Sequence, residues 1–135
     1  MLKAFDAPTR EDCTAERTNT NTPLQALNLL NDPSFAEAAR GLATRLLSEP
    51  EGEKDLAARA WLRCLSRPAT AEELSILGEF HASELARFNS NPAAATQLLG
   101  VGEQPASKEI PPVKLAAATS LARAILNLHE TITRY

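Results

Sequence analysis

The chain has 135 residues, which is enough for one domain with a single hydrophobic core. Its 17 acidic and 14 basic residues give a net charge near −3 and are interleaved without a basic run, which argues against binding to DNA or RNA. The apolar runs are far shorter than the roughly 20 residues of a membrane-spanning helix, and the first residues lack the apolar core of a signal peptide. We therefore expect neither membrane insertion nor a signal peptide in this chain.

The apolar composition predicts an all-α fold. The sequence has 24 Ala and 20 Leu but only four Ile and two Val, and Ala and Leu favour helices over strands. The nine Pro and five Gly lie mainly between the leucine-rich segments, where they would end helices. We predict a single domain built as an irregular bundle of five to six helices, with the bundle over residues 22–128.

The first 21 residues show no sustained period, and we expect residues 1–21 to form an extended lead-in. Thr22 followed by Pro23 is typical of a helix start, because the hydroxyl caps the helix and proline has no N–H to leave unpaired. This helix should end near Asn31, since the next two residues, Asp and Pro, repeat the start signal. The second helix then has apolar residues spaced by four, three and four: Phe35, Ala39, Leu42 and Leu46.

A third helix is predicted from about Glu53 to Leu65, after a break that contains Pro and Gly. The fourth has the clearest start of all. Thr70 can cap it, and Glu73 can reach back to the Thr70 amide, which together make a capping box ahead of a leucine-rich run.

A short fifth helix should begin at Pro92 and end at Gly100, and a polar loop leads from there to the last helix. That helix, from Val113 to about Leu128, has two adjoining apolar stripes, and such a wide apolar surface implies burial against several partners. We therefore predict that it is central, with residues 129–135 as a tail. The two stripes are Leu115, Ala118, Ala122 and Ile125, and Ala117, Leu121, Ala124 and Leu128.

The polar run before the first helix is the main candidate binding site. Thr22 has a structural role as the cap, and Asn19 and Asn21 are residues that form turns before helices. The same run places Arg17 at a helix N-terminus, with Gln25 in the first turn, where free N–H groups and the helix dipole favour an anion. Both interpretations stay open, with the cap and turn as the simpler one.

No catalytic residue and no metal site are expected elsewhere. His81 lies beside the inward stripe of the fourth helix, where a packed and hydrogen-bonded side chain is the simpler interpretation. His129 opens "HETIT", which lacks the second histidine of a zinc protease motif because Thr133 stands there. Cys13 and Cys64 stand apart without the spacing of a zinc, thioredoxin or haem motif, and we expect buried thiols rather than a disulfide.

Four segments carry a family resemblance: "FDAPTREDCT", "RTNTNTPLQALNLLNDPSFAEAAR", "LSRPATAEEL" and "ARAILNLHETITRY". In this order they resemble the C-terminal region of the planctomycete PSD domain, a family of unknown function found in large proteins that often carry planctomycete cytochrome-c-like domains. The resemblance covers essentially the whole chain, and its most specific part runs from Asn21 to Arg40. Family members tend to have an acidic residue where this chain has His129.

The resemblance implies that the chain is the C-terminal fragment of a larger multidomain protein. It also implies a periplasmic or cell-envelope location, with the remaining domains of the parent protein or a cytochrome-c-like domain as partners. Any haem would sit on a separate domain, because this chain has no C-x-x-C-H motif, and we expect no cofactor in the chain itself. No catalytic residues are implied by the family.

Two functional hypotheses of different classes follow. The first is a non-catalytic helical interaction or structural module of that larger, cytochrome-c-associated protein. The second is a contribution of Arg17, Asn19, Asn21 and Gln25 to a substrate- or anion-binding site of an envelope enzyme, completed by the missing N-terminal region. Polar groups converging in a cleft would indicate the second, whereas a broad exposed apolar patch would indicate the first.

A thermal-shift series separates the two interpretations of the polar run. If it only starts a helix, Thr22→Ala lowers the free energy of unfolding by about 0.5 to 2 kcal/mol through loss of the cap. Phosphate should then raise the melting temperature no more than a matched chloride control does. Stabilisation by phosphate that Arg17→Ala abolishes, without changing the stability of the phosphate-free protein, would contradict this and establish an anion site.

Overall fold

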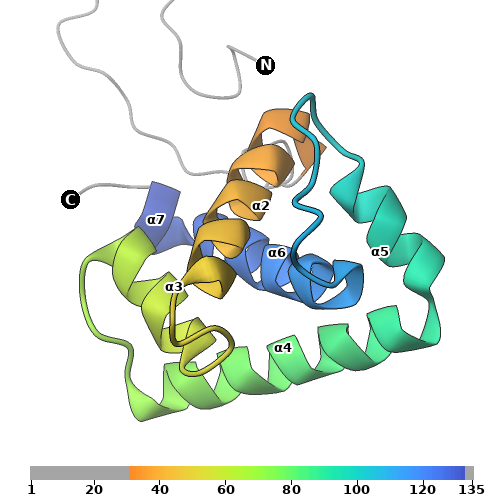
Figure 1. Ribbon diagram of the computed structural model, residues 1–135. Coiled ribbons are helices and arrows are strands. Elements are labelled where there is room, and N and C mark those ends of the chain that lie inside the picture. Colours follow the sequence, from red (N-terminus) through yellow and green to blue (C-terminus); the bar gives the residue numbers. More distant parts are fainter. Residues whose placement is uncertain (1–30, 133–135) are drawn as a thin grey trace, which may run out of the picture.

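The computed structural model describes residues 31–132, and this part of the chain is all-α, as the composition predicts. The lead-in and the predicted helix from Thr22 lie outside the described residues. With the labels of Figure 1, the helices are α2 (Pro33–Ser48), α3 (Leu56–Leu65), α4 (Ala71–Ser90), α5 (Pro92–Leu99), α6 (Pro112–Leu126) and α7 (His129–Ile132).

Helix α6 is the centre of the bundle, which confirms the expectation from its two apolar stripes. In Figure 1 it lies between α2 and α4, and every other described helix contacts it. Its buried residues are Leu115, Ala116, Ala117, Ala118, Thr119, Leu121, Ala122 and Ile125. The run of three alanines is almost completely inaccessible to solvent, and such small side chains let the surrounding helices approach α6 closely.

The one buried hydroxyl of α6 is satisfied within its own helix. Thr119 is 1% exposed, and its Oγ1 donates a hydrogen bond of 2.7 Å to the Leu115 carbonyl. A buried hydroxyl without a partner would destabilise the fold, and this bond removes that penalty. The larger core residues around α6 come from the other helices, and Phe88 and Leu46 are at most 1% exposed.

The starts of α2, α4 and α5 lie where the sequence predicts them, and each of the three has a side-chain cap. The Asp32 carboxylate accepts a hydrogen bond of 2.8 Å from the Ser34 amide at the start of α2. Both bonds of the capping box between Thr70 and Glu73 form at the start of α4. Asn91 caps α5.

Helix α3 begins at Leu56, which corrects the predicted start at Glu53. Asp55 has φ 51°, in the left-handed region, so the right-handed helix cannot continue backwards through it. The turns before Asp55 are held instead by Arg59. Its guanidinium donates to the carbonyls of Leu46 (3.1 Å), Lys54 (3.2 Å) and Gly52.

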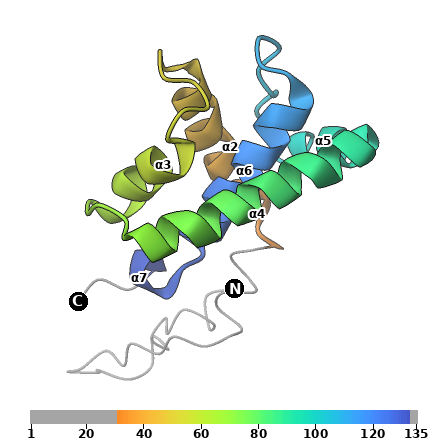
Figure 2. The ribbon, with the colours of Figure 1, turned by 90° about the horizontal axis from the view of Figure 1, so that it is seen from below.

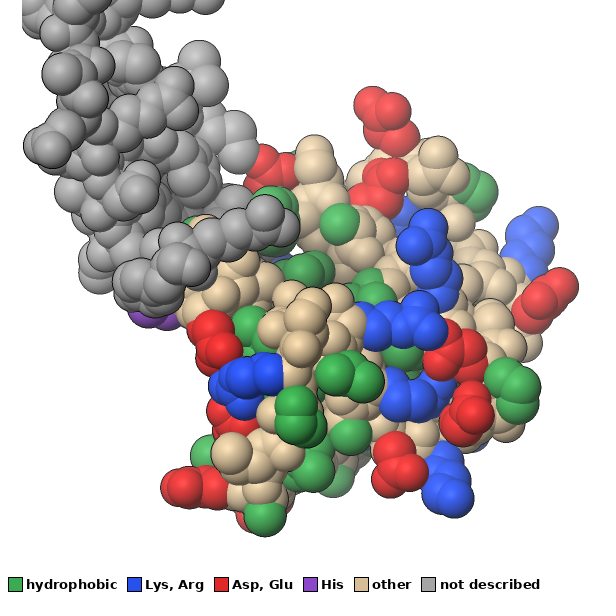
Figure 3. All heavy atoms as spheres, turned by 90° about the vertical axis from the view of Figure 1, so that its left-hand side faces the viewer, with side chains coloured by type: hydrophobic (Ala, Val, Ile, Leu, Met, Phe, Trp, Pro, Cys, Tyr) green, Lys and Arg blue, Asp and Glu red, His purple; other side chains and the backbone are tan. Residues whose placement is uncertain are grey.

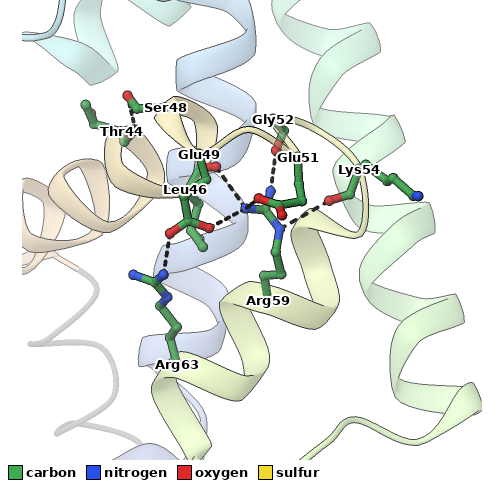
Figure 4. Close-up of polar contacts among 9 residues, drawn as sticks. All are labelled: Thr44, Leu46, Ser48, Glu49, Glu51, Gly52, Lys54, Arg59 and Arg63. Carbon is green, nitrogen blue, oxygen red and sulfur yellow. Dashed lines mark hydrogen bonds and ion pairs between the residues drawn. The ribbon is translucent and has the colours of Figure 1, made fainter.

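Figure 4 shows how Glu49 joins this arrangement. One carboxylate oxygen lies 2.5 Å from Arg59 Nη1, and the other pairs with Arg63. The connection between α2 and α3 is therefore closed by two arginines from α3 around one carboxylate from the end of α2. On the face shown in Figure 3, basic and acidic side chains lie next to each other in this way and do not separate into patches of one sign.

Residues 129–132 form α7 and not the predicted tail. The guanidinium of Arg67, at the α3–α4 corner, holds this helix through two bonds of 2.7 Å to the Glu130 carboxylate. The Thr131 hydroxyl donates 2.7 Å to the Ile125 carbonyl and so ties α7 to the end of α6. Arg67 also binds the Glu73 carboxylate through bonds of 2.8 and 3.1 Å, and it lies 4.9 Å from the Trp61 ring centroid.

This cluster predicts a specific loss of stability in acid. The Arg67 guanidinium, followed by the Thr70 amide, holds the pKa of Glu73 at about 2, below its ordinary value of 4.5, and Arg67 also lowers the pKa of Glu130. Since both pKa values are lower in the folded than in the unfolded chain, their stabilisation is present above about pH 4.5 and is lost as the pH falls toward 2.

Arg67→Met should therefore lower the melting temperature at pH 7 and reduce its fall between about pH 5 and 2. Arg45→Met is the matched control, because Arg45 is an exposed arginine outside the cluster, and it should keep the wild-type pH profile. Parallel profiles for wild type and Arg67→Met would contradict a role of this cluster in holding α7.

Candidate functional site

The candidate binding residues from the sequence are not placed by the structure. Arg17, Asn19, Asn21 and Gln25 all lie outside the described residues, so their role as an anion or substrate site stays a prediction. Within residues 31–132, a groove lies between α2 and the segment 102–107, which belongs to the connection from α5 to α6. Its volume is about 840 Å³, and Figure 1 shows this connection running alongside α2.

Arg40 forms the inner wall of the groove and is the one charged side chain among the buried residues of the described part. It is 4% exposed. Its guanidinium donates to three backbone carbonyls: Leu99 (2.5 Å), Val101 (2.7 Å) and Gln104 (2.5 Å). These carbonyls come from the end of α5 and the residues just after it, where helix carbonyls lack partners in their own helix. Arg40 therefore fixes the course of the chain as it leaves α5.

Glu37 holds the same segment one turn earlier on α2. Its carboxylate accepts hydrogen bonds from the amides of Glu103 (2.7 Å) and Gln104 (3.3 Å). Gly102 has φ 97° and lies so close that a Cβ at this position would overlap the Glu37 carboxylate. The Glu37 carboxylate thus binds two backbone amides and the Arg40 guanidinium binds three backbone carbonyls, all within residues 99–104.

The roles of Glu37 and Arg40 are not predicted from the sequence. Glutamate and arginine three residues apart on a helix usually form an exposed ion pair, which contributes little. A signal was present, since Arg40 directly follows Ala39 on the apolar side of the second helix and both charges end the most specific family segment. An arginine at the edge of an apolar stripe is a sign that its charge has partners inside the fold.

The arrangement determines what the groove can do chemically. Both charged groups on its inner side are occupied by backbone of the same chain, and the Thr44 hydroxyl donates 2.8 Å to the Arg40 carbonyl. Arg45 stands at the rim, exposed, and no hydrogen bond or ion pair engages it within residues 31–132. Arg40 and Glu37 are therefore engaged within the fold, and Arg45 is a cation of the groove that remains exposed.

His81 and Cys64 are the next candidates for a chemical role in the described part of the chain. His81 is half-buried on α4, where desolvation lowers its pKa, while the Glu53 carboxylate acts in the opposite direction. Cys64 is a half-buried free thiol whose pKa is raised by burial, which makes it less reactive. No three His, Cys, Asp or Glu side chains gather to hold a metal in the described part of the chain. Nor does any helix there have the length and apolar character to cross a membrane.

A family model matches residues 1–81, more than half of the chain, and its description is PSD1, protein of unknown function (DUF1553). The chain therefore belongs to this family, which confirms the resemblance seen in the sequence over residues 1–81; the segment "ARAILNLHETITRY" lies beyond the matched range. No curated protein and no solved structure matches the chain. The matched range includes Glu37 and Arg40 but ends within α4, so the backbone that these two side chains bind lies beyond it.

Two glycine substitutions test the role of Glu37. Gly102→Ala should lower the free energy of unfolding by at least about 1–2 kcal/mol, because alanine is strained at a positive φ and its Cβ displaces the Glu37 carboxylate. The matched control is Gly78→Ala on α4, where nothing lies within 4 Å of an added Cβ. It should raise the stability by about 0.5–1 kcal/mol through better helix propensity.

Urea unfolding of the three proteins measures both effects. If Gly102→Ala were as stable as the wild type, residues 102–104 would not be held against Glu37 as described.

Proposed function

We propose that this domain is a non-catalytic helical module that packs against the rest of a larger, cytochrome-c-associated protein of the cell envelope. The observation that carries the proposal is the state of the charged groups in the groove. Arg40 and Glu37 bind backbone of their own chain, so the groove is a shaped surface and not a set of reactive groups. Because these charged groups are already engaged, we infer that the groove recognises another protein segment by its shape.

The α2 side of the groove is suited to close contact with a partner. Ser34, Ala38 and Gly41 are exposed there, and their spacing of four and three residues places them on one side of the helix. Nothing lies within 4 Å of a Cβ added to Gly41. A helix or extended segment of the parent protein could therefore approach the α2 backbone closely, with the segment 102–107 as the opposite wall.

The cellular setting in this proposal rests on the family resemblance. The partner is a remaining domain of the parent protein or its cytochrome-c-like domain, the haem belongs to that separate domain, and the location is the periplasm or cell envelope. Family membership is consistent with this setting but describes the family only as one of unknown function.

Binding of this chain to the rest of its parent protein tests the proposal. The probe is the separately purified remainder, including its cytochrome-c-like domain, in isothermal titration with the wild-type chain. Ala38→Glu and Gly41→Glu should each weaken binding at least about tenfold, because both introduce a charge into the contact. Ala82→Glu is the matched control, since Ala82 is an exposed alanine on α4 and away from the groove.

Two results would contradict the proposal. One is absence of binding by the wild-type chain at about 100 µM, which would mean a binding free energy less favourable than about −5 kcal/mol. The other is equal binding by the groove variants and the wild type.

The alternative function, part of an anion- or substrate-binding site of an envelope enzyme, is favoured by one observation. Arg45 is an exposed cation without a described partner at the rim of the groove. In this alternative it acts together with Arg17 and residues of the parent protein. Including Arg45→Met in the phosphate series for Arg17→Ala tests it, because phosphate stabilisation would then depend on both arginines.

A further inference from the structure

Helix α4 is an edge helix with an unpartnered side. It has 20 residues, of which only Leu77 and Phe88 are buried. Figure 2 views the molecule from the side on which α4 lies, and the helix crosses the front of this view with α6 behind it. Ile76 and Phe80, one helical turn apart, are 61% and 38% exposed. The two side chains together form a small apolar strip on the exposed side of α4.

These two residues belong to a longer stripe with opposite charges at its ends. We call it the α4 stripe: Glu72, Ile76, Phe80, Ser83 and Arg87, spaced by four, four, three and four residues, all of them exposed. Such spacing places all five on one side of the helix. From the start of α4 toward its end, the stripe therefore consists of one acidic side chain, two apolar ones, one small one and one basic one.

The charges at the two ends can take a partner from outside. Glu72 makes no hydrogen bond or ion pair within the described residues. Arg87 lies over the Phe88 ring, 4.4 Å from its centroid, and binds Glu84 at 2.8 Å, yet its side chain remains 59% exposed. Its guanidinium has five N–H donors, and a single contact to Glu84 leaves several of them available.

We propose that the α4 stripe pairs with the α4 stripe of a second copy of this chain, with the two helices antiparallel. A two-fold axis between residues 79 and 80 places Glu72 of one copy opposite Arg87 of the other, and the same pair forms again by symmetry. Ile76 then lies opposite Ser83, with the two Phe80 side chains near the axis. A parallel arrangement would oppose Glu72 with Glu72 and Arg87 with Arg87, which is unfavourable.

The occupant is a second copy because the stripe is complementary to itself. Two-fold symmetry requires that a surface carry both partners of each contact, and the α4 stripe does so for its ion pair and for its apolar centre. From residue 72 to residue 87 the stripe is about 22 Å long. A contact limited to one helical stripe of this length buries less area than a standard interface of about 800 Å² per partner. The association should therefore be weak and depend on concentration.

This inference is independent of the proposed function. The α4 stripe lies across α6 from α2 and its groove. Failure of the dimer would therefore leave the groove proposal unaffected, and failure of groove binding would leave the dimer unaffected.

Sedimentation equilibrium of the chain tests the pairing. The weight-average mass should rise from 14.6 kDa toward twice that value as the concentration increases from about 5 to about 500 µM. Ile76→Asp should keep the chain monomeric over this range. Leu62→Asp is the matched control, because Leu62 is also an exposed apolar residue, 52% exposed on α3 compared with 61% for Ile76. This variant should associate as the wild type does.

The ion pair gives a second test that also fixes the orientation. Glu72→Arg and Arg87→Glu should each weaken dimerisation about tenfold, and the double variant should restore it to within about twofold, because the exchanged charges again oppose each other. Circular dichroism of each variant checks that α4 remains folded.

Three results would overturn the proposal. A monomer at every concentration would exclude a second copy as the occupant and leave the stripe to a different protein. Association that survives Ile76→Asp would place the contact elsewhere on the molecule. A double variant as weak as the single ones would exclude the antiparallel arrangement.

Discussion

Arg40 places a positive charge inside the bundle, and the fold around it satisfies that charge. A buried charge without partners destabilises a fold by several kcal/mol, and here three backbone carbonyls accept from the guanidinium. Because these carbonyls close α5 and begin the connection to α6, the contact sets how α5 ends and where the chain turns toward the central helix. Glu37 completes the contact by binding amides of the same connection.

The same physical solution occurs at two other corners. Arg59 binds carbonyls before α3, and Arg67 joins the α3–α4 corner to α7 through two carboxylates. A planar guanidinium with several donors is suited to this task, because it can bind acceptors from separate segments at once. These three guanidinium groups are engaged inside the fold, and the proposals therefore concern contacts of the described part of the chain with other proteins.

Features coded by neighbouring residues could be predicted from the sequence, and features that depend on distant residues could not. The caps at Asp32 and Thr70 are local patterns, and the central place of α6 follows from the width of its apolar surface. The sequence predicts the start of α3 too early, because Arg59 binds carbonyls of preceding residues and no helical period reveals these contacts. Likewise α7 depends on a pair 63 residues apart, between Arg67 and Glu130.

The groove shows the same limit, since Arg40 binds residues that lie 59 to 64 positions away in the sequence. The predicted site residues from Arg17 to Gln25 lie outside the described residues, so an anion or substrate site there remains a prediction from the sequence. What the sequence did show of the groove was an arginine beside an apolar stripe, without any indication of its partners.

The measurement that tests this account most directly is the urea unfolding of Arg40→Lys. Lysine keeps the charge but has no fork of donors for three separate carbonyls, so the free energy of unfolding should fall by about 2–4 kcal/mol as carbonyls lose their partners. The helical circular dichroism signal should be retained under native conditions. A loss below about 0.5 kcal/mol, the range of ordinary surface substitutions, would contradict the account, because the charge of Arg40 would then not depend on this backbone contact.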